Sequence, residues 1–153
     1  MEDEVDIKFY KDLETEDDLG FILKAHLNIE LQLVKFISSY MTQKEFCDWS
    51  KINYSAKLQL AMGFGLHKDL EKPLIKIGKI RNDFAHLLNH KFTDKDAISL
   101  FNGLEGTMIH RGVKHSFAST LDRELKPKKE SCRDLLTVIL INLRQAIKAA
   151  YSD

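Results

Sequence analysis

Six consecutive residues, Arg81 to His86, carry the side chains in this sequence that are best suited to chemistry. An arginine keeps its positive charge at every physiological pH and offers a planar fork of N–H donors that matches a phosphate. A histidine titrates near neutral pH and can accept or donate a proton. The segment therefore predicts a functional site rather than a packing motif.

The helix that contains this segment sets the angles between its side chains. A buried stripe is predicted by apolar residues at helical spacing, namely Ile77, Ile80, Phe84 and Leu87. At about 100° per residue, Arg81 and His86 point about 140° apart, whereas Asn82 and His86 are only about 40° apart. A single copy of this helix is therefore expected to form only part of the site. A homodimer could complete the site by bringing two copies into one cleft. The alternative is a structural role, in which Arg81 pairs with Asp83 or Glu30 and His86 packs in the core.

The elements that must position these residues are predicted to be helices throughout. Only two prolines and seven glycines occur in 153 residues, and no window shows sustained alternation of β-branched residues. Acids at residues 16–18 predict the start of a nearly all-apolar helix that runs to about residue 41. Further helices are expected to begin after Ser50 or Asn53, near residues 68 and 93, and after an N-cap at Ser131. The fold class is therefore an all-α bundle of about five to six helices.

The first of these helices contains polar residues that need an explanation. His26, Asn28 and Glu30 lie in an otherwise apolar segment, so they require polar partners or a cavity. Glu30 could pair with Arg81 or His86 and adjust its charge, or it could be an ordinary surface glutamate on one exposed stripe of the helix. His26 lies four residues before Glu30, and the two could belong to one polar cluster.

Composition places the chain among ordinary globular proteins. A length of 153 residues with 44% hydrophobic and 30% charged residues predicts a single domain over residues 1–153, with an acidic, mobile segment at residues 1–15. The acidic start and the lack of a long apolar run predict a cytoplasmic protein with no membrane contact. Cys47 and Cys132 are too few and too far apart to indicate a zinc site or a disulfide framework.

The segment Arg81 to His86 resembles the R-x(4 to 6)-H motif of HEPN domains, including the polar residue that follows the arginine. HEPN domains are small helical bundles that are often dimeric. The resemblance implies an RNA-binding and RNA-cleaving domain of the toxin or defence type, a metal-independent endoribonuclease in which a ribose hydroxyl attacks the neighbouring phosphate. It implies that Arg81 stabilises the charge on the phosphorane, that His86 is the general acid or base, and that Asn82 orients one of them.

A wider stretch, roughly residues 16–92, is similar to the mannitol operon repressor-like family. The similarity is carried by Tyr54 to Leu66, which ends in Gly63-Phe64-Gly65-Leu66, and by the helix from Leu74 to His86. The glycine turn departs slightly from the usual Leu-Gly-Leu form. This resemblance implies a non-catalytic transcriptional regulator that acts through a regulatory protein partner. Direct sequence-specific DNA binding is not expected, because no basic recognition helix is visible and the formal net charge is zero.

The charge distribution suggests two further surfaces. Residues 1–18 contain nine acids and two lysines, which would suit an antitoxin-like module that binds a basic partner. Residues 110–129 contain six cations against two acids and could attract a polyanion. His110, Arg111 and Lys114 could line an RNA path there, or could be solvated residues of a loop or helix end.

Two remaining patterns favour structure over chemistry. Asp83, His86 and His90 have the spacing of metal ligands, but no HExxH glutamate accompanies them, so no metal and no other cofactor is expected. Phe46, Trp49 and Tyr54 predict a packing patch between helices rather than a platform for stacking bases.

Overall fold

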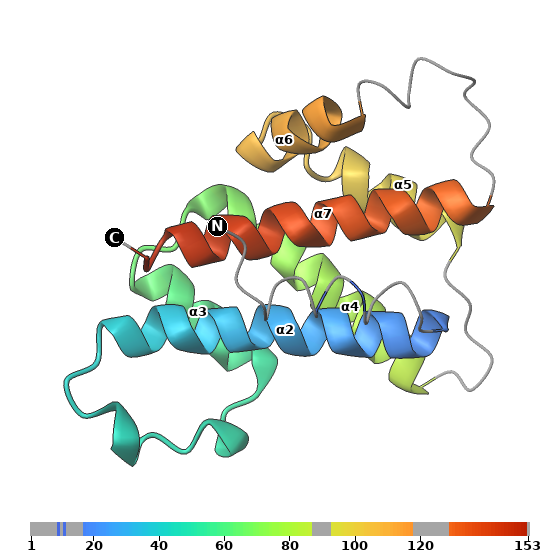
Figure 1. Ribbon diagram of the computed structural model, residues 1–153. Helices are drawn as coiled ribbons and strands as arrows, with labels where there is room; N and C mark the ends of the chain where they lie inside the picture. The colour runs from blue at the N-terminus through green and yellow to red at the C-terminus, as the bar shows by residue number, and fades with distance from the viewer. Residues whose placement is uncertain (1–8, 10, 12–16, 87–92, 118–128, 153) are drawn as a thin grey trace.

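The chain is a bundle of α-helices (Figure 1). The computed structural model describes residues 9, 11, 17–86, 93–117 and 129–152. Within this part of the chain there are six α-helices and no strand: α2 (Asp18–Ser39), α3 (Tyr54–Gly63), α4 (Glu71–His86), α5 (Asp94–Asn102), α6 (Met108–Phe117) and α7 (Lys129–Ala149). Three single turns of 3-10 helix complete the connections, at Lys44–Phe46, Trp49–Lys51 and Lys68–Leu70. The predicted all-α bundle is confirmed.

Helix α2 is the centre of the bundle. It contacts α3, α4 and α7, so it is packed on several sides, as its apolar sequence predicts (Figure 1). Its core face carries seven buried apolar side chains: Phe21, Ile22, Ala25, Ile29, Leu33, Phe36 and Ile37. On another side, Asn28 accepts a hydrogen bond of 2.6 Å from Nε of the buried Arg144 in α7. Asn28, one of the polar residues for which the sequence requires a partner, thus has that partner in the C-terminal helix.

Local capping explains where three of the six described helices begin. The side chain of Asp17 accepts a hydrogen bond from the Gly20 amide at 2.8 Å, and that of Asn53 accepts one from the Ala56 amide at 2.9 Å. Thr93 and Asp96 form a reciprocal capping box at the start of α5. The predicted helix starts near residues 17, 53 and 93 are therefore confirmed.

The predicted start of the last helix is wrong. Helix α7 begins at Lys129 rather than after an N-cap at Ser131. Lysine and glutamate both have a high intrinsic preference for helix, as the pair before Ser131 requires. The helix can therefore include these two residues. The rest of the basic loop, residues 126–128, lies outside the described residues.

The acidic N-terminal segment is described only at Phe9 and Lys11 before residue 17. Phe9 is 8% exposed and belongs to the hydrophobic core, although the sequence predicts mobility for residues 1–15. Burial of its apolar ring stabilises this position, and the mobility of the rest of residues 1–15 stays a prediction. Among the described helices, none combines the length and apolar character that crossing a membrane would require.

Gly78 in α4 permits a close contact with Tyr54 in α3. A Cβ atom at Gly78 would lie 2.7 Å from Cε1 of the Tyr54 ring, whereas a Cβ at Gly63 would meet no heavy atom within 4 Å. We expect Gly78→Ala to lower the free energy of unfolding by about 1–3 kcal/mol, because the overpacked ring must move. This loss should exceed the gain of roughly 0.5–1 kcal/mol that alanine brings to a helix interior. Urea denaturation measures the change.

Gly63→Ala is the matched control, because it makes the same substitution in a helix without the steric conflict. It should leave stability unchanged or raise it slightly. Equal stabilities for the two variants would contradict the proposed contact.

Candidate functional site

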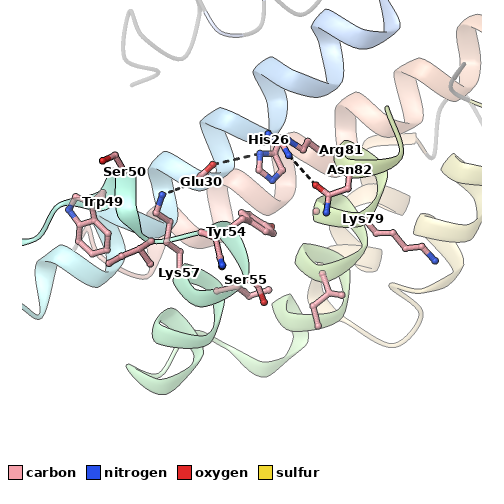
Figure 2. Close-up of a pocket in the computed structure, with 15 residues that line it drawn as sticks. His26, Glu30, Trp49, Ser50, Tyr54, Ser55, Lys57, Lys79, Arg81 and Asn82 are labelled. Atoms are coloured by element: carbon pink, nitrogen blue, oxygen red, sulfur yellow. Dashed lines mark hydrogen bonds and ion pairs between the residues drawn. The ribbon is translucent and has the colours of Figure 1, made fainter. Parts of the chain in front are cut away.

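A cleft of about 750 Å³ opens between α2, α3 and α4, and we call it the polar cleft (Figure 2). Its volume is in the range of small-molecule and cofactor sites. Its charged and strongly polar lining comes from all three helices: His26, Glu30, Lys57, Lys79, Arg81 and Asn82. Trp49 and Tyr54 add aromatic surface at the side of α3. The cleft therefore offers cations, an acid–base group and aromatic faces together.

Two of the three residues predicted as catalytic line this cleft. Arg81 is half-buried, and its Nη1 donates a hydrogen bond of 3.0 Å to Oδ1 of the exposed Asn82. The implied role of Asn82, to orient a neighbouring site residue, stays a prediction. This contact with Asn82 uses only one of the five N–H donors of the guanidinium, so the remaining donors can bind an anion in the cleft.

His86 does not lie with them. It is the last residue of α4, it is exposed, and it is not part of the cleft lining. The alternative prediction that His86 packs in the core is therefore wrong, since the end of the helix projects beyond the buried stripe. Asp83 is half-buried and also lies outside the lining. The assembly of Arg81 with His86 in a homodimer stays a prediction.

Glu30 is paired with a residue that the sequence did not suggest. Nζ of Lys57 in α3 lies 2.5 Å from Oε1 of Glu30, and Lys57 is 7% exposed. The predicted pairing of Glu30 with Arg81 or His86 is replaced by this contact. Helical spacing could have revealed it, because Lys57 lies four residues before the buried Ala61 and hence on the inner face of α3. A lysine in that position needs an acid as partner.

His26 joins the same cluster, as its i, i+4 spacing to Glu30 predicts. Its Nδ1 lies 3.8 Å from Oε2 of Glu30, and its ring centroid is 4.4 Å from that of Tyr54. The side chain is 4% exposed, and its Nε2 has no hydrogen-bond partner among the described residues. Figure 2 shows the imidazole between Glu30 and Arg81. The histidine that shares the cleft with Arg81 is therefore His26.

The surroundings of His26 keep its imidazole neutral at neutral pH. Burial is the largest effect and lowers the pKa of His26 below 6.5. The negative charge of Glu30 opposes this shift, and the positive charges of Arg81 and Lys57 add to it. The imidazole is therefore a free base, able to accept a proton or a hydrogen bond.

Tyr54 forms one wall of the cleft and has a structural hydrogen bond. Its hydroxyl donates to the backbone carbonyl of Leu74 at 2.8 Å and so joins α3 to α4. Burial, followed by the charge of Glu30, raises the pKa of Tyr54 above its ordinary value. The phenol therefore stays protonated and acts as a donor. Its ring is fixed between Gly78 and His26.

The predicted aromatic patch is only partly correct. Trp49 and Tyr54 are partly buried and pack against the core, as expected. Phe46 is 80% exposed, so its place in that patch is wrong. It belongs to the short 3-10 turn Lys44–Phe46, in which no residue is buried.

The other predicted site residues lie away from the cleft. His110 and Arg111 are on α6, which packs against α7, and the ring of His110 lies 4.7 Å from that of Phe101. Arg111 is exposed, and Lys114 is on the same helix. His90 lies outside the described residues, and within them no group of three or more His, Cys, Asp or Glu side chains could hold a metal ion. An RNA path along α6 stays a prediction.

Comparison of the chain with models of protein families, with curated proteins and with solved structures gives no match. Function is therefore inferred from the side chains of the polar cleft and from their geometry.

The lowered pKa of His26 makes stability depend on pH. The unfolded chain takes up a proton on this imidazole near pH 6.5, whereas the folded protein does so only at lower pH. The neutral His26 therefore contributes its full share to the free energy of unfolding above pH 6.5. This contribution is lost as the pH falls through the pKa that His26 has in the folded protein. We expect an NMR titration midpoint below 6.5 for the resonance that His26→Gln removes.

The same variant supplies the stability measurement. Between pH 7.5 and pH 5.5, denaturant unfolding should show a smaller loss of stability for His26→Gln than for the wild type. A His26 midpoint at or above 6.5 would contradict the burial of this imidazole.

Proposed function

We propose that the protein binds single-stranded RNA in the polar cleft and cleaves it without a metal ion, as the resemblance to HEPN domains implies. The observation that carries this proposal is that Arg81 and Asn82, two residues of the motif, line a cleft of about 750 Å³ together with His26, a neutral histidine whose Nε2 has no hydrogen-bond partner among the described residues. A cleft of this size can enclose one nucleotide. The site thus combines phosphate binding with acid–base chemistry.

The polar cleft offers the contacts that RNA requires. The exposed Lys79 and the half-buried Arg81 supply positive charge for a phosphodiester. Trp49 offers a partly exposed ring on which a base can stack, as in other single-strand binding sites. Because the chain has a formal net charge of zero, binding depends on these local cations rather than on the field of the whole protein.

We also propose that the chain forms a homodimer through the outer face of α2. Three leucines of this helix are exposed on one side: Leu19 at 43%, Leu27 at 63% and Leu31 at 46%. Leu27 and Leu31 each follow a cleft residue, His26 and Glu30 respectively, by one position. A second copy on this face would therefore border the cleft and could bring a further histidine to it. The exposed leucines also support the second candidate function, a non-catalytic regulator that acts through protein contacts.

Substitution of Arg81 tests RNA binding. We expect Arg81→Ala to weaken binding of a fluorescein-labelled single-stranded RNA by about 10- to 100-fold in buffer with EDTA, because a hydrogen bond to a charged group contributes about 1.5–3 kcal/mol. Fluorescence anisotropy measures the affinity, and gel electrophoresis of the same samples measures cleavage.

Lys72→Ala is the matched control. Lys72 is an exposed cation on the same helix, nine residues earlier and hence on the opposite side, and it does not line the cleft. This variant should bind RNA with wild-type affinity. Equal losses in both variants would show that binding follows total charge rather than the cleft.

Substitution of Leu27 tests the dimer. A glutamate in the centre of an apolar interface would be buried without a partner, so Leu27→Glu should convert a dimer to monomers in sedimentation experiments at micromolar concentration. Ile98→Glu on α5, where Ile98 is 43% exposed, is the control and should leave the dimer intact. A wild-type protein that sediments as a monomer would refute the proposed dimer.

A further inference from the structure

We propose that His26 is the residue that accepts the proton of the attacking ribose hydroxyl, and that it acts in the same subunit as Arg81. This assignment rests on the proposed RNA-cleaving function and identifies a catalytic residue outside the segment Arg81 to His86. With this assignment, each subunit has a cation, Arg81, and a proton acceptor, His26, in one cleft. Both are present without a contribution from a second copy.

The first observation is the unfilled hydrogen-bonding capacity of His26. Its Nε2 is buried and has no partner among the described residues, although the side chain lines the polar cleft. Most buried polar atoms in proteins are hydrogen-bonded, and a buried polar atom without a partner lowers the stability of the fold. The cleft is the place from which a ligand hydroxyl can supply the missing bond.

The second observation is the orientation of the imidazole. Oε2 of Glu30 lies 3.8 Å from Nδ1, and Glu30 is held in place by Lys57 through its other oxygen at 2.5 Å. A carboxylate on that side favours the tautomer with the proton on Nδ1, which leaves the lone pair on Nε2. The nitrogen without a partner is therefore a hydrogen-bond acceptor.

The third observation is the set of charges around the ring. Glu30 of α2, Lys57 of α3 and Arg81 of α4 act on the imidazole, and Tyr54 of α3 packs against it. Burial and the two cations outweigh the single acid, so the pKa of His26 is lowered. The base is consequently unprotonated at neutral pH, as proton abstraction requires.

The position of Arg81 links this base to a phosphate. Figure 2 shows the Arg81 side chain beside the His26 ring, with its hydrogen bond to Asn82 directed away from Glu30. A phosphodiester bound to the guanidinium would lie next to the imidazole. Neighbouring side chains enclose Nε2 of His26. In the proposed complex, the Arg81 side chain rotates away from the His26 ring to bind the phosphate, and the ribose hydroxyl then reaches Nε2.

The reaction then proceeds by transfer within the RNA. Nε2 of His26 takes the proton of the ribose 2′-hydroxyl, and the 2′ oxygen forms a bond to the adjacent phosphorus. The bond from phosphorus to the 5′ oxygen of the next nucleotide breaks, and that oxygen takes a proton from water in the open cleft. The products are a 2′,3′-cyclic phosphate end and a 5′-hydroxyl end, and the protonated imidazole returns its proton to solvent. Arg81 stabilises the added negative charge on the phosphorane.

The test is the pH dependence of single-turnover RNA cleavage by the full chain in EDTA. The wild-type rate should fall on the acid side with a midpoint below pH 6.5, where His26 becomes protonated. We expect His26→Gln to lower the rate by about 100-fold or more and to remove this acid limb, with RNA affinity within about twofold of the wild type. His67→Gln is the control for an exposed histidine outside the cleft and should keep the wild-type rate.

A second variant keeps the test decisive if His26→Gln does not fold, which circular dichroism shows. The double variant Glu30→Gln/Lys57→Met removes both charges of the buried pair and so leaves neither uncompensated. Because the charge of Glu30 acts on His26 more strongly than that of Lys57, this variant should move the acid limb to lower pH. His86→Ala should leave the position of the acid limb unchanged, whatever it does to the rate.

Three results would overturn the assignment. The first is a wild-type acid limb in folded His26→Gln, and the second is an acid limb that does not move in Glu30→Gln/Lys57→Met. The third is loss of the acid limb in His86→Ala alone, which would assign the base to His86 and leave the proposed RNA cleavage intact. A wild-type protein that neither binds nor cleaves RNA would instead refute the proposed function itself.

Discussion

The ion pair between Glu30 and Lys57 is the contact on which the polar cleft depends. Lys57 is buried and Glu30 is partly buried, and a charge removed from water is stable only beside a partner. The pair joins α2 to α3 at the level where the rings of His26 and Tyr54 meet. It also fixes the carboxylate that faces Nδ1 of His26. Loss of either charge would leave the other uncompensated beneath the site.

Helix α2 connects this pair to the rest of the fold. One side of it fills the core, one carries His26 and Glu30 into the cleft, and a third exposes leucines. Such a helix cannot shift to suit the site without disturbing the core, because interiors are packed at the density of organic crystals. The cleft is therefore a rigid feature on its α2 side, and adaptation to a ligand falls to long side chains such as Arg81.

Local sequence was sufficient to predict most of the helices, because their signals act over three or four residues. Asp17, Asn53 and Thr93 each bond to a backbone amide three positions later, so their effect can be read from neighbouring residues alone. The same reasoning failed at Ser131, where a good N-cap residue competes with helix-forming residues just before it. It also failed at Phe46, whose exposure depends on where a 3-10 turn places it relative to the bundle.

The sequence by itself determined that the chain is a helical bundle and that Arg81 and Asn82 are neighbours on one helix. The tertiary structure alone decided which histidine accompanies them. His86 is held apart from the cleft by the geometry of its own helix, whereas His26 is brought there from α2 by the packing of α2 against α4. Helical periodicity describes the faces of single helices, and it carries no information on which face meets which. The polar cleft therefore appears only when three helices are assembled.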